Sequence, residues 1–393
     1  MDKALNRNPT FYSAEACELT EFATLTQQRV DPDEVPHAAE TPNNIPVYDM
    51  AKLAPKLDDT SERRALMGEW AQILKAGAGV FVLRSAYSDT GAVDAATGLF
   101  NRIIAEEKAT DRSDADHFAT AGSNDRIWNS LQKLCEADPE VFLLYHGNAS
   151  VDAACEAWLG PNYQMTAQVN VVHPGGSAQQ AHRDYHLGFQ TAEISAQYPA
   201  HVHDLSPLLT LQGGIVHVDS PLESGPTKLL PFSQLYRPGY AAWRREDFRA
   251  YFEEHYVQLP MKKGDALFFN PALFHAAGAN TSTDIHRMVN LLQISSAFGR
   301  AMETIDRTKM CKLTLSHLKR LVSTAKLGGL SLDAAIAATA EGYSFPTNLD
   351  NDPPVGGLAP QTQAALLKEA VTGVWPEDRF LSELDAQNAR KLS

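Results

Sequence analysis

Cysteine is scarce in this sequence, and the patterns that make cysteine functional are absent. The 393 residues include 4 cysteines, and no two of them form a CxxC pair. Their spacing therefore gives no support to a disulfide framework or to a metal site built from thiolates. We expect these cysteines to be reduced and to serve structural roles.

Positive charge and long apolar runs are also in short supply. Lys and Arg total 34 against 48 Asp and Glu, so the formal net charge is −14. Because nucleic acid and anionic membrane surfaces repel such a protein, neither is an expected partner. No segment approaches the roughly 20 apolar residues of a membrane span, and the first residues, MDKALNRNPT, lack the layout of a signal peptide. We expect a cytoplasmic protein whose partner is a small molecule, and the sequence leaves a homo-oligomer open.

Composition divides the chain into three zones. Residues 1–60 are rich in Asp, Glu, Asn, Thr and Pro, which predicts an N-terminal arm. Residues 61–300 contain regularly spaced short β-type runs with turn residues between them, a pattern typical of an antiparallel sandwich or barrel. Residues 301–393 return to a helical period and predict a helical extension packed on the core. The expected fold class is α+β.

Two helices are expected before the β-type runs. In SERRALMGEWAQILKAG, residues 61–77, the apolar residues Leu66, Trp70 and Leu74 recur every four positions and share one helical face. A second helix is expected over 91–108. We therefore predict helices that flank the β core.

The stretch AHRDYHLGF, residues 181–189, offers candidate chemistry. It is not a kinase catalytic loop, because that loop needs Asn where this chain has Phe189, and no glycine-rich phosphate loop is present. His182 and Asp184 at positions i and i+2 would project from one face of a strand and could reach the same ion. Two His and one carboxylate form the facial triad of non-haem Fe(II) sites, with the third ligand supplied from elsewhere.

A second His-x-Asp triplet occurs at His217-Val218-Asp219. With 13 histidines, such a triplet is expected about once by chance. Asp219 has the position of a turn-starting residue, and His217 that of a strand residue with a local partner. His182 and Asp184 instead follow the flexible HPGGSAQQ segment and precede YHLGF, a setting typical of a cleft mouth. We favour the first copy as the ligand pair.

A longer downstream pattern adds to this site. Residues 264–295, GDALFFNPALFHAAGANTSTDIHRMVNLLQIS, place a histidine after an apolar strand and an arginine at the start of the next strand. Together with HRDYH and SPLESGPTKLLPFSQ, they resemble the phytanoyl-CoA dioxygenase family of Fe(II)- and 2-oxoglutarate-dependent oxygenases, over roughly residues 80 to 300. The resemblance implies a double-stranded β-helix, a cupin-like jelly roll with flanking helices, as the domain at 61–300.

The same resemblance assigns residues to roles. It implies that His182, Asp184 and His275 bind Fe(II) and that Arg287 binds the far carboxylate of 2-oxoglutarate. Guanidinium suits this role because its planar fork holds a carboxylate with two hydrogen bonds and stays charged when buried. The alternative for Arg287 is an ion pair with an acidic residue on a neighbouring strand. Ala277 stands where the family often has a hydroxyl residue, which leaves the detail of the carboxylate pocket open.

Further contacts are expected in the strand before the triad, at Gln212, in the segment HFATAGSNDRIWNSLQKL, residues 117–134, where the family builds part of its substrate pocket, and directly after the ligand pair. Most are equally compatible with a structural role, in the core or on a surface helix, and for His186 a fold-back hydrogen bond is the favoured interpretation. The candidate cosubstrate contacts are Gln168, Asn170 and Gln212. The candidate substrate contacts are Asn124, Arg126, Trp128, Tyr185 and His186.

The resemblance implies a reaction in which 2-oxoglutarate and O2 are consumed and succinate and CO2 are released. Because Asp184 is present where related halogenases carry a small residue, hydroxylation of an unactivated C–H bond is the expected outcome. The expected substrate is a small polar or amphipathic metabolite, since no clustered basic patch suits an acyl-CoA. Two alternatives remain: the same iron site acting as a desaturase, epimerase or cyclase, and a jelly-roll protein that binds a ligand without catalysis.

Overall fold

The computed structural model describes residues 9–110, 123–184 and 186–392. Its centre is a seven-stranded sheet in the order β1-β2-β7-β5-β9-β4-β3, in which β1 and β2 are parallel and the other neighbours antiparallel. A second sheet pairs β6 with β8. The strands are β1 (Val47–Asp49), β2 (Val80–Arg84), β3 (Asn124–Ile127), β4 (Gln164–Val172), β5 (Thr210–Val216), β6 (Lys228–Leu229), β7 (Ala266–Phe269), β8 (His275–Ala276) and β9 (Arg287–Ser295).

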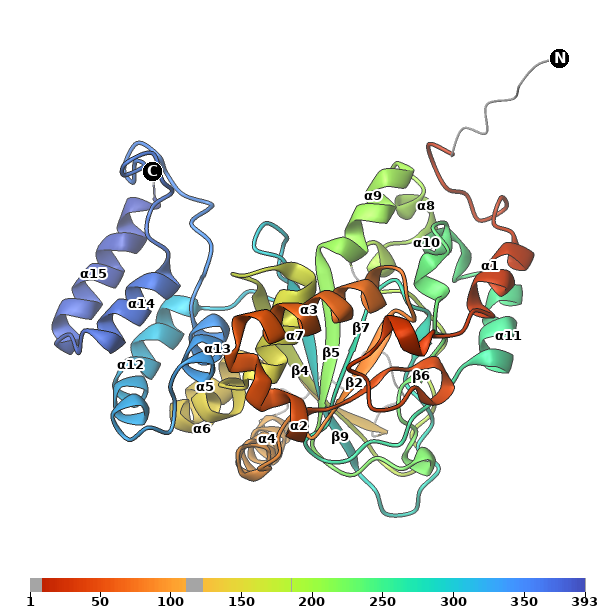
Figure 1. Cartoon of the computed structure of the whole chain (residues 1–393), viewed down its shortest axis with the longest axis horizontal. Helices are drawn as coiled ribbons and strands as arrows, with labels where there is room; N and C mark the ends of the chain where they lie inside the picture. Colours follow the sequence, from red (N-terminus) through yellow and green to blue (C-terminus); the bar gives the residue numbers. More distant parts are fainter. Residues whose placement is uncertain (1–8, 111–122, 185, 393) are drawn as a thin grey trace.

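Helices surround the large sheet and extend from one end of it (Figure 1). The mixture of helices and strands confirms the expected mixed class. The helices are α1 (Leu19–Thr26), α2 (Met50–Leu53), α3 (Thr60–Lys75), α4 (Gly91–Ala109), α5 (Ser130–Ala137), α6 (Pro139–His146), α7 (Ala149–Leu159), α8 (Ala192–Ser195), α9 (Ala200–Leu205), α10 (Gly239–Ala242), α11 (Glu246–His255), α12 (Arg307–Ser323), α13 (Leu330–Thr339), α14 (Gln363–Thr372) and α15 (Glu377–Arg390).

The predicted helix at 61–77 is α3. It begins after Asp59, whose carboxylate accepts the backbone N–H groups of Ser61 and Glu62 and so satisfies donors that have no partner within the helix. Its apolar face packs on the sheet through Trp70, whose ring stacks on Phe81 of β2 at 5.3 Å. The second predicted helix corresponds to α4.

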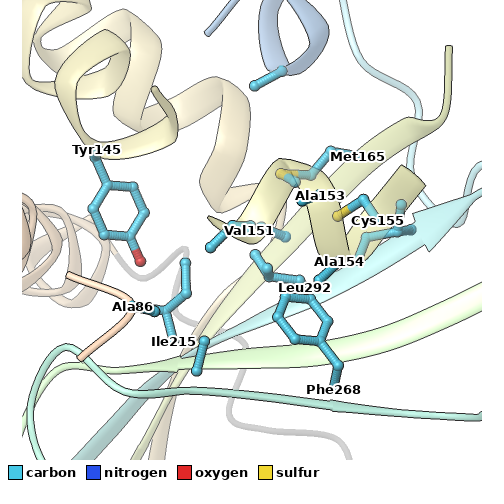
Figure 2. Packing of buried hydrophobic residues seen from close by; sticks show 14 of the residues in the cluster. Ala86, Tyr145, Val151, Ala153, Ala154, Cys155, Met165, Ile215, Phe268 and Leu292 are labelled. Carbon is cyan, nitrogen blue, oxygen red and sulfur yellow. The ribbon is translucent and has the colours of Figure 1, made fainter. Parts of the chain in front are cut away.

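The two faces of the large sheet differ in their surroundings. Figure 2 shows the side of the sheet that carries Ile215, Phe268 and Leu292 packed against Val151 and neighbouring residues of α7, which closes that face as a dry core. Alternate residues of the same strands point to the other face, as the period of two in a strand requires. That other face lines a cavity.

The segments at the chain ends pack against this centre. Within the predicted arm, β1 joins the large sheet beside β2, and the Phe22 ring of α1 lies 4.8 Å from that of Phe274. At the other end, Arg307 of α12 is buried and donates to the carbonyl oxygen of Met165 on β4 at 2.9 Å. The division at 60 and 300 stays a prediction.

Two further expectations concern the state of the cysteines and the lack of a membrane-spanning segment. Cys17, Cys135, Cys155 and Cys311 are buried and unbridged among the described residues. Within the same residues, no helix has both the length and the apolar character needed to span a bilayer.

Candidate metal centre and its cavity

The side chains of His182, Asp184 and His275 lie close together. A backbone bridge pairs His182 with His275: each backbone N–H donates to the other's carbonyl oxygen, at 3.0 and 3.2 Å. Asp184 follows two residues later, and its Oδ2 lies 3.8 Å from Nε2 of His182 and 3.6 Å from Nε2 of His275. One ligand atom from each residue lies within 4.8 Å of the others. Residues far apart in sequence thus converge on one point.

The two imidazole rings are oriented for metal binding. Nδ1 of His182 lies 2.8 Å from the carbonyl oxygen of Gln180, and Nδ1 of His275 lies 2.9 Å from that of Leu273. Because a carbonyl oxygen can only accept, each Nδ1 carries the proton and each Nε2 keeps its lone pair. Metal-bound histidines typically donate from the other nitrogen in this way.

The charge state of the triad suits a divalent cation. Burial lowers the pKa of His182, which favours the neutral ring that a metal needs. Burial alone would raise the pKa of Asp184, but His182, His275 and Gln212 together hold it well below its usual range. Two neutral nitrogens and one carboxylate oxygen form a donor set that fits Fe(II).

Gln212 and Tyr240 hold Asp184 in place. Nε2 of Gln212, on β5, donates to Oδ2 of Asp184 at 2.8 Å, and the Tyr240 hydroxyl donates to its backbone oxygen at 2.6 Å. Gln212 was predicted as a cosubstrate contact, and the structure places it in direct contact with a candidate ligand. Its Oε1 is buried and has no hydrogen-bond partner in the described residues.

A cavity of about 550 Å³ opens from the triad along the inner face of the large sheet. It brings together most of the site residues that the sequence predicted, including two on β3 and its C-terminal end. The predicted residues that line it are Arg126, Trp128, Gln168, Asn170, His182, Asp184, Gln212, His275 and Arg287.

Arg287 begins β9 and is 6% exposed. Its Nη1 donates to the carbonyl oxygen of Ser224 at 3.2 Å, and no carboxylate of the described residues forms an ion pair with it. Burial lowers its pKa to about 10. The predicted alternative, an ion pair across neighbouring strands, is therefore absent from the described part of the chain. A buried guanidinium that faces a cavity is most stable with an anion beside it.

The described part of the segment 117–134, residues 123–134, contains a strand followed by the start of α5, whereas the alternative interpretation was a surface helix. Residues Asn124–Ile127 form β3 and pair with β4, so that Arg126 is opposite Asn170. Nη1 of Arg126 donates to Oε1 of Gln168 at 3.1 Å, and its guanidinium lies 5.0 Å from the Trp128 ring centre. This strand adds one basic and one aromatic side chain to the cavity wall.

Three predicted substrate contacts are not placed in the cavity wall. Asn124 is buried at the start of β3 and is not a lining residue. His186 is exposed, has a left-handed backbone with φ of 38°, and is not a lining residue either. Tyr185 lies outside the described residues.

The second His-x-Asp triplet lies elsewhere. Nδ1 of His217 is 2.7 Å from the Thr97 hydroxyl and Nε2 is 2.7 Å from the Tyr145 hydroxyl. Burial lowers the pKa of His217 to about 3. Oδ1 of Asp219 accepts the backbone N–H of Lys263 at 2.8 Å. The expectation of a local partner for His217 was wrong, because Thr97 and Tyr145 are distant in sequence and reach it through tertiary packing.

The sequence analysis did not predict several residues of the cavity wall. Gln293 lies on the same face of β9 as Arg287, three pairs of positions further along, and accepts a hydrogen bond from Gln212 at 3.3 Å. The alternation of a strand was a signal that could have found it. Trp243 and Met302 also line the cavity, and no local pattern in the sequence marks them.

Part of this chain is similar in sequence to known dioxygenases. The family model for "Phytanoyl-CoA dioxygenase (PhyH)" matches residues 76–289. Dioxygenase andF of Emericella variicolor is 27% identical over 139 residues, which are 34% of this chain and 43% of that protein. Dioxygenase trt7 of Aspergillus terreus is 26% identical over 155 residues, or 39% and 48%. The matched region spans less than half the length of each relative.

Solved structures also match part of this chain. The non-heme α-ketoglutarate-dependent carbocyclase SnoK from nogalamycin biosynthesis has 19% identity and a TM-score of 0.43, with 64% of this chain and 90% of that chain covered. The epimerase SnoN from the same biosynthesis has 16% identity and a TM-score of 0.40, with 59% and 83% covered.

Proposed function

Because the chain belongs to the phytanoyl-CoA dioxygenase family, we propose that it is an Fe(II)- and 2-oxoglutarate-dependent oxygenase whose iron ligands are His182, Asp184 and His275. The observation that carries the assignment is the state of the two histidines. Both donate Nδ1 to a backbone carbonyl oxygen and turn Nε2 toward the Asp184 carboxylate. In a purely structural core, buried ring nitrogens are usually hydrogen-bonded on both sides.

Arg287 is the proposed anchor of 2-oxoglutarate. It is buried, lines the same cavity as the triad and has no carboxylate partner in the described residues. The far carboxylate of 2-oxoglutarate would supply the missing negative charge through two parallel hydrogen bonds. Ala277, which also lines the cavity, offers no hydroxyl to assist, so the hold on that carboxylate depends on Arg287.

The remaining chemistry divides between the metal and the chain. Iron, when bound, supplies the oxidation that couples O2 and 2-oxoglutarate to attack on a C–H bond. The chain keeps Asp184 ionised, orients it through Gln212 and encloses the reactants in the cavity on the face of the sheet opposite the α7 core. Gln168 and Asn170 are proposed to contact the cosubstrate from β4, because both side chains line the cavity.

We propose a small amphipathic metabolite as substrate and hydroxylation as the outcome. The wall combines the rings of Trp128, Phe189 and Trp243 with the guanidinium of Arg126. An apolar body with one anionic or carbonyl group would match this mixture. Desaturation, epimerisation and ring closure would use the same iron site, and product analysis distinguishes them from hydroxylation.

The fold is proposed to be a double-stranded β-helix. Its walls would be the large sheet and the small β6–β8 sheet, with the isolated bridges His182–His275 and Ser220–Met261 extending the small sheet. Residues 61–300 would form this domain, with 1–60 as an arm and 301–393 as a helical extension. The proposed iron site then lies between the two walls.

The test is a spectroscopic titration without oxygen. Fe(II) and 2-oxoglutarate added to the protein should produce the weak visible charge-transfer band of a chelated keto acid. His275→Ala should lose the band through loss of the metal, and Arg287→Ala should weaken it through loss of the cosubstrate. Asp219→Ala is the matched control and should keep the band. A folded, metal-loaded wild type that shows no band would refute the cosubstrate assignment.

A further inference from the structure

Arg183 stands between two proposed iron ligands in sequence, but its side chain runs away from them. The residue is 2% exposed. Its Nη2 donates to the carbonyl oxygens of Ser233 and Tyr236, at 2.6 and 2.8 Å. The guanidinium packs so closely on Gly239 that a Cβ there would lie 1.9 Å from Cζ. The side chain is therefore fixed in one position behind the metal centre.

The charge of Arg183 has no counterion in the described residues. No carboxylate there forms an ion pair with it, and the acidic group next in sequence, Asp184, is directed at His182 and His275. Nε of Arg183 is buried and has no hydrogen-bond partner within the described part of the chain. Tyr240 and Phe274 provide ring faces 5.4 and 5.2 Å from Cζ, which attract a cation but do not neutralise it.

A second cavity, which we name the rear cavity, adjoins this guanidinium. Its volume is about 280 Å³. Two further buried polar atoms of its wall have no hydrogen-bond partner among the residues that the structure describes. They are Nδ1 of His203 and Oε1 of Gln234, and these residues are 2% and 9% exposed. The lining residues are Lys75, Trp158, Arg183, His203, Asp204, Pro207, Leu208, Gln234, Leu235, Arg237, Asn270 and Ala272.

The rear cavity has an excess of positive charge. Arg237 is matched by Asp204, with Nε to Oδ1 at 3.1 Å and Nη2 to Oδ2 at 2.6 Å. Lys75 has no ion-pair partner among residues 9–110, 123–184 and 186–392, so it and Arg183 are both unmatched. Beside these charges, Trp158, Pro207 and Leu208 provide an apolar wall. Unmatched donors next to an apolar surface are the features of a site for an organic anion.

We propose that the rear cavity binds a small organic oxyanion, with its carboxylate or phosphate group on Arg183 and a short apolar portion against Trp158 and Leu208. Both Nη2 hydrogens of Arg183 are already donated to the carbonyl oxygens of Ser233 and Tyr236, so the oxyanion would be bound through Nη1, and Lys75 adds a second positive charge at the rim. His203 Nδ1 is positioned in the wall to share the ligand's polar atoms. Arg183 lies in the walls of both cavities, but Arg287 is not a lining residue of the rear cavity, and binding there requires neither iron nor 2-oxoglutarate.

The test is isothermal titration calorimetry on the full chain, free of iron and 2-oxoglutarate, with butyrate and inorganic phosphate as probes. Leu208→Glu places a carboxylate in the wall and should weaken binding of the preferred probe about tenfold or more through like-charge repulsion. Leu205→Glu is the matched control, because Leu205 and Leu208 are 46% and 47% exposed and Leu205 is not in the wall. Lys75→Met should weaken binding in the same direction as Leu208→Glu.

Two further measurements distinguish the rear cavity from the main cavity and identify the class of ligand. In an Arg287→Ala background, which lacks the anion site of the main cavity, the preferred probe should still bind and Leu208→Glu should still weaken it. A stronger response to butyrate identifies a carboxylate ligand, and a stronger response to phosphate identifies a phosphate ester. Absence of heat with both probes, equal binding by Leu208→Glu and Leu205→Glu, or loss of binding in Arg287→Ala would each overturn the proposal. None of these outcomes bears on the charge-transfer band that tests the proposed oxygenase.

Discussion

The pattern His-x-Asp occurs at His182-Arg183-Asp184 and again at His217-Val218-Asp219. In the first copy, histidine and aspartate are directed at the same point, 3.8 Å apart, with His275 beside them. In the second copy they separate, because the His217 ring enters the core while Asp219 caps a backbone N–H on the surface. Equal spacing therefore leads to opposite environments.

The difference lies in what the Nδ1 atom does. The backbone carbonyl oxygen of Gln180 accepts a hydrogen bond from Nδ1 of His182, which leaves the Nε2 lone pair for a metal ion. At His217 both nitrogens are taken by the hydroxyls of Thr97 and Tyr145. A histidine whose nitrogens are both paired within the core contributes stability and has no lone pair left for a metal.

The largest contrast is expected between Asp184→Ala and Asp219→Ala. Asp184→Ala removes the charged candidate ligand, and succinate formation coupled to substrate should fall by more than about 100-fold. Mutation of a residue that only hydrogen-bonds to a metal ligand already lowers activity by about 10- to 100-fold. Asp219→Ala should retain wild-type turnover. Succinate release with Fe(II) and 2-oxoglutarate measures both variants. Wild-type turnover in Asp184→Ala would remove it from the triad.

The opposite contrast should appear in stability with His217→Leu. The variant leaves the Thr97 and Tyr145 hydroxyls without a buried partner, and the free energy of unfolding should fall by about 2–3 kcal/mol. Urea unfolding measures the change, and Fe(II) affinity of the folded variant should match the wild type. If Fe(II) affinity fell tenfold while stability was kept, the division of roles between the two copies would be wrong.

Gln212→Ala sharpens the comparison at the first copy alone. Gln212 donates to Oδ2 of Asp184 at 2.8 Å, and its loss should weaken Fe(II) binding by about tenfold because the ligand is no longer oriented. Asn170→Ala is the control, since Asn170 lines the same cavity without a hydrogen bond to a ligand. Equal Fe(II) affinity in the two variants would show that Gln212 does not position Asp184.

Local pattern predicted the parts of the fold that local forces decide. The apolar period around Trp70 marked α3, and the Asp59 cap fixes where that helix begins. The strand β3 escaped prediction because NDRI has no alternation of its own and is extended through its pairing with Val169 to Val172 of β4. Tertiary contacts override weak propensity in such segments.

The candidate site shows the same limit. The candidate ligands and Arg287 could be selected by their resemblance to a family, and the structure brings them into one cavity. The contact of Gln212 with Asp184 could not be predicted, because it depends on the register of β5 against β9 and on the path of the chain after His182. The partners of His217 escaped prediction for the same reason.

The smallest expected effect is a difference in acid sensitivity between the two copies. Burial lowers the pKa of His217 to about 3 in the native state, whereas an unfolded histidine titrates near 6.5. Between these values the unfolded chain takes up a proton that native His217 does not, so native stability is complete above about pH 6.5 and declines as the pH falls toward 3. The contribution of one such group is at most about 1.4 kcal/mol per pH unit.

His217→Leu should remove this contribution and flatten the pH dependence of unfolding between pH 6 and pH 4.5. The variant should retain part of the dependence, because burial also lowers the pKa of His146, to about 3, and the pKa of His182. Urea unfolding of the iron-free wild type and variant at several pH values measures the two slopes. Asp219→Ala is the control and should follow the wild type. Parallel curves for wild type and His217→Leu would mean that native His217 takes up its proton as readily as the unfolded chain does, and the contrast with His182 would then rest on metal binding alone.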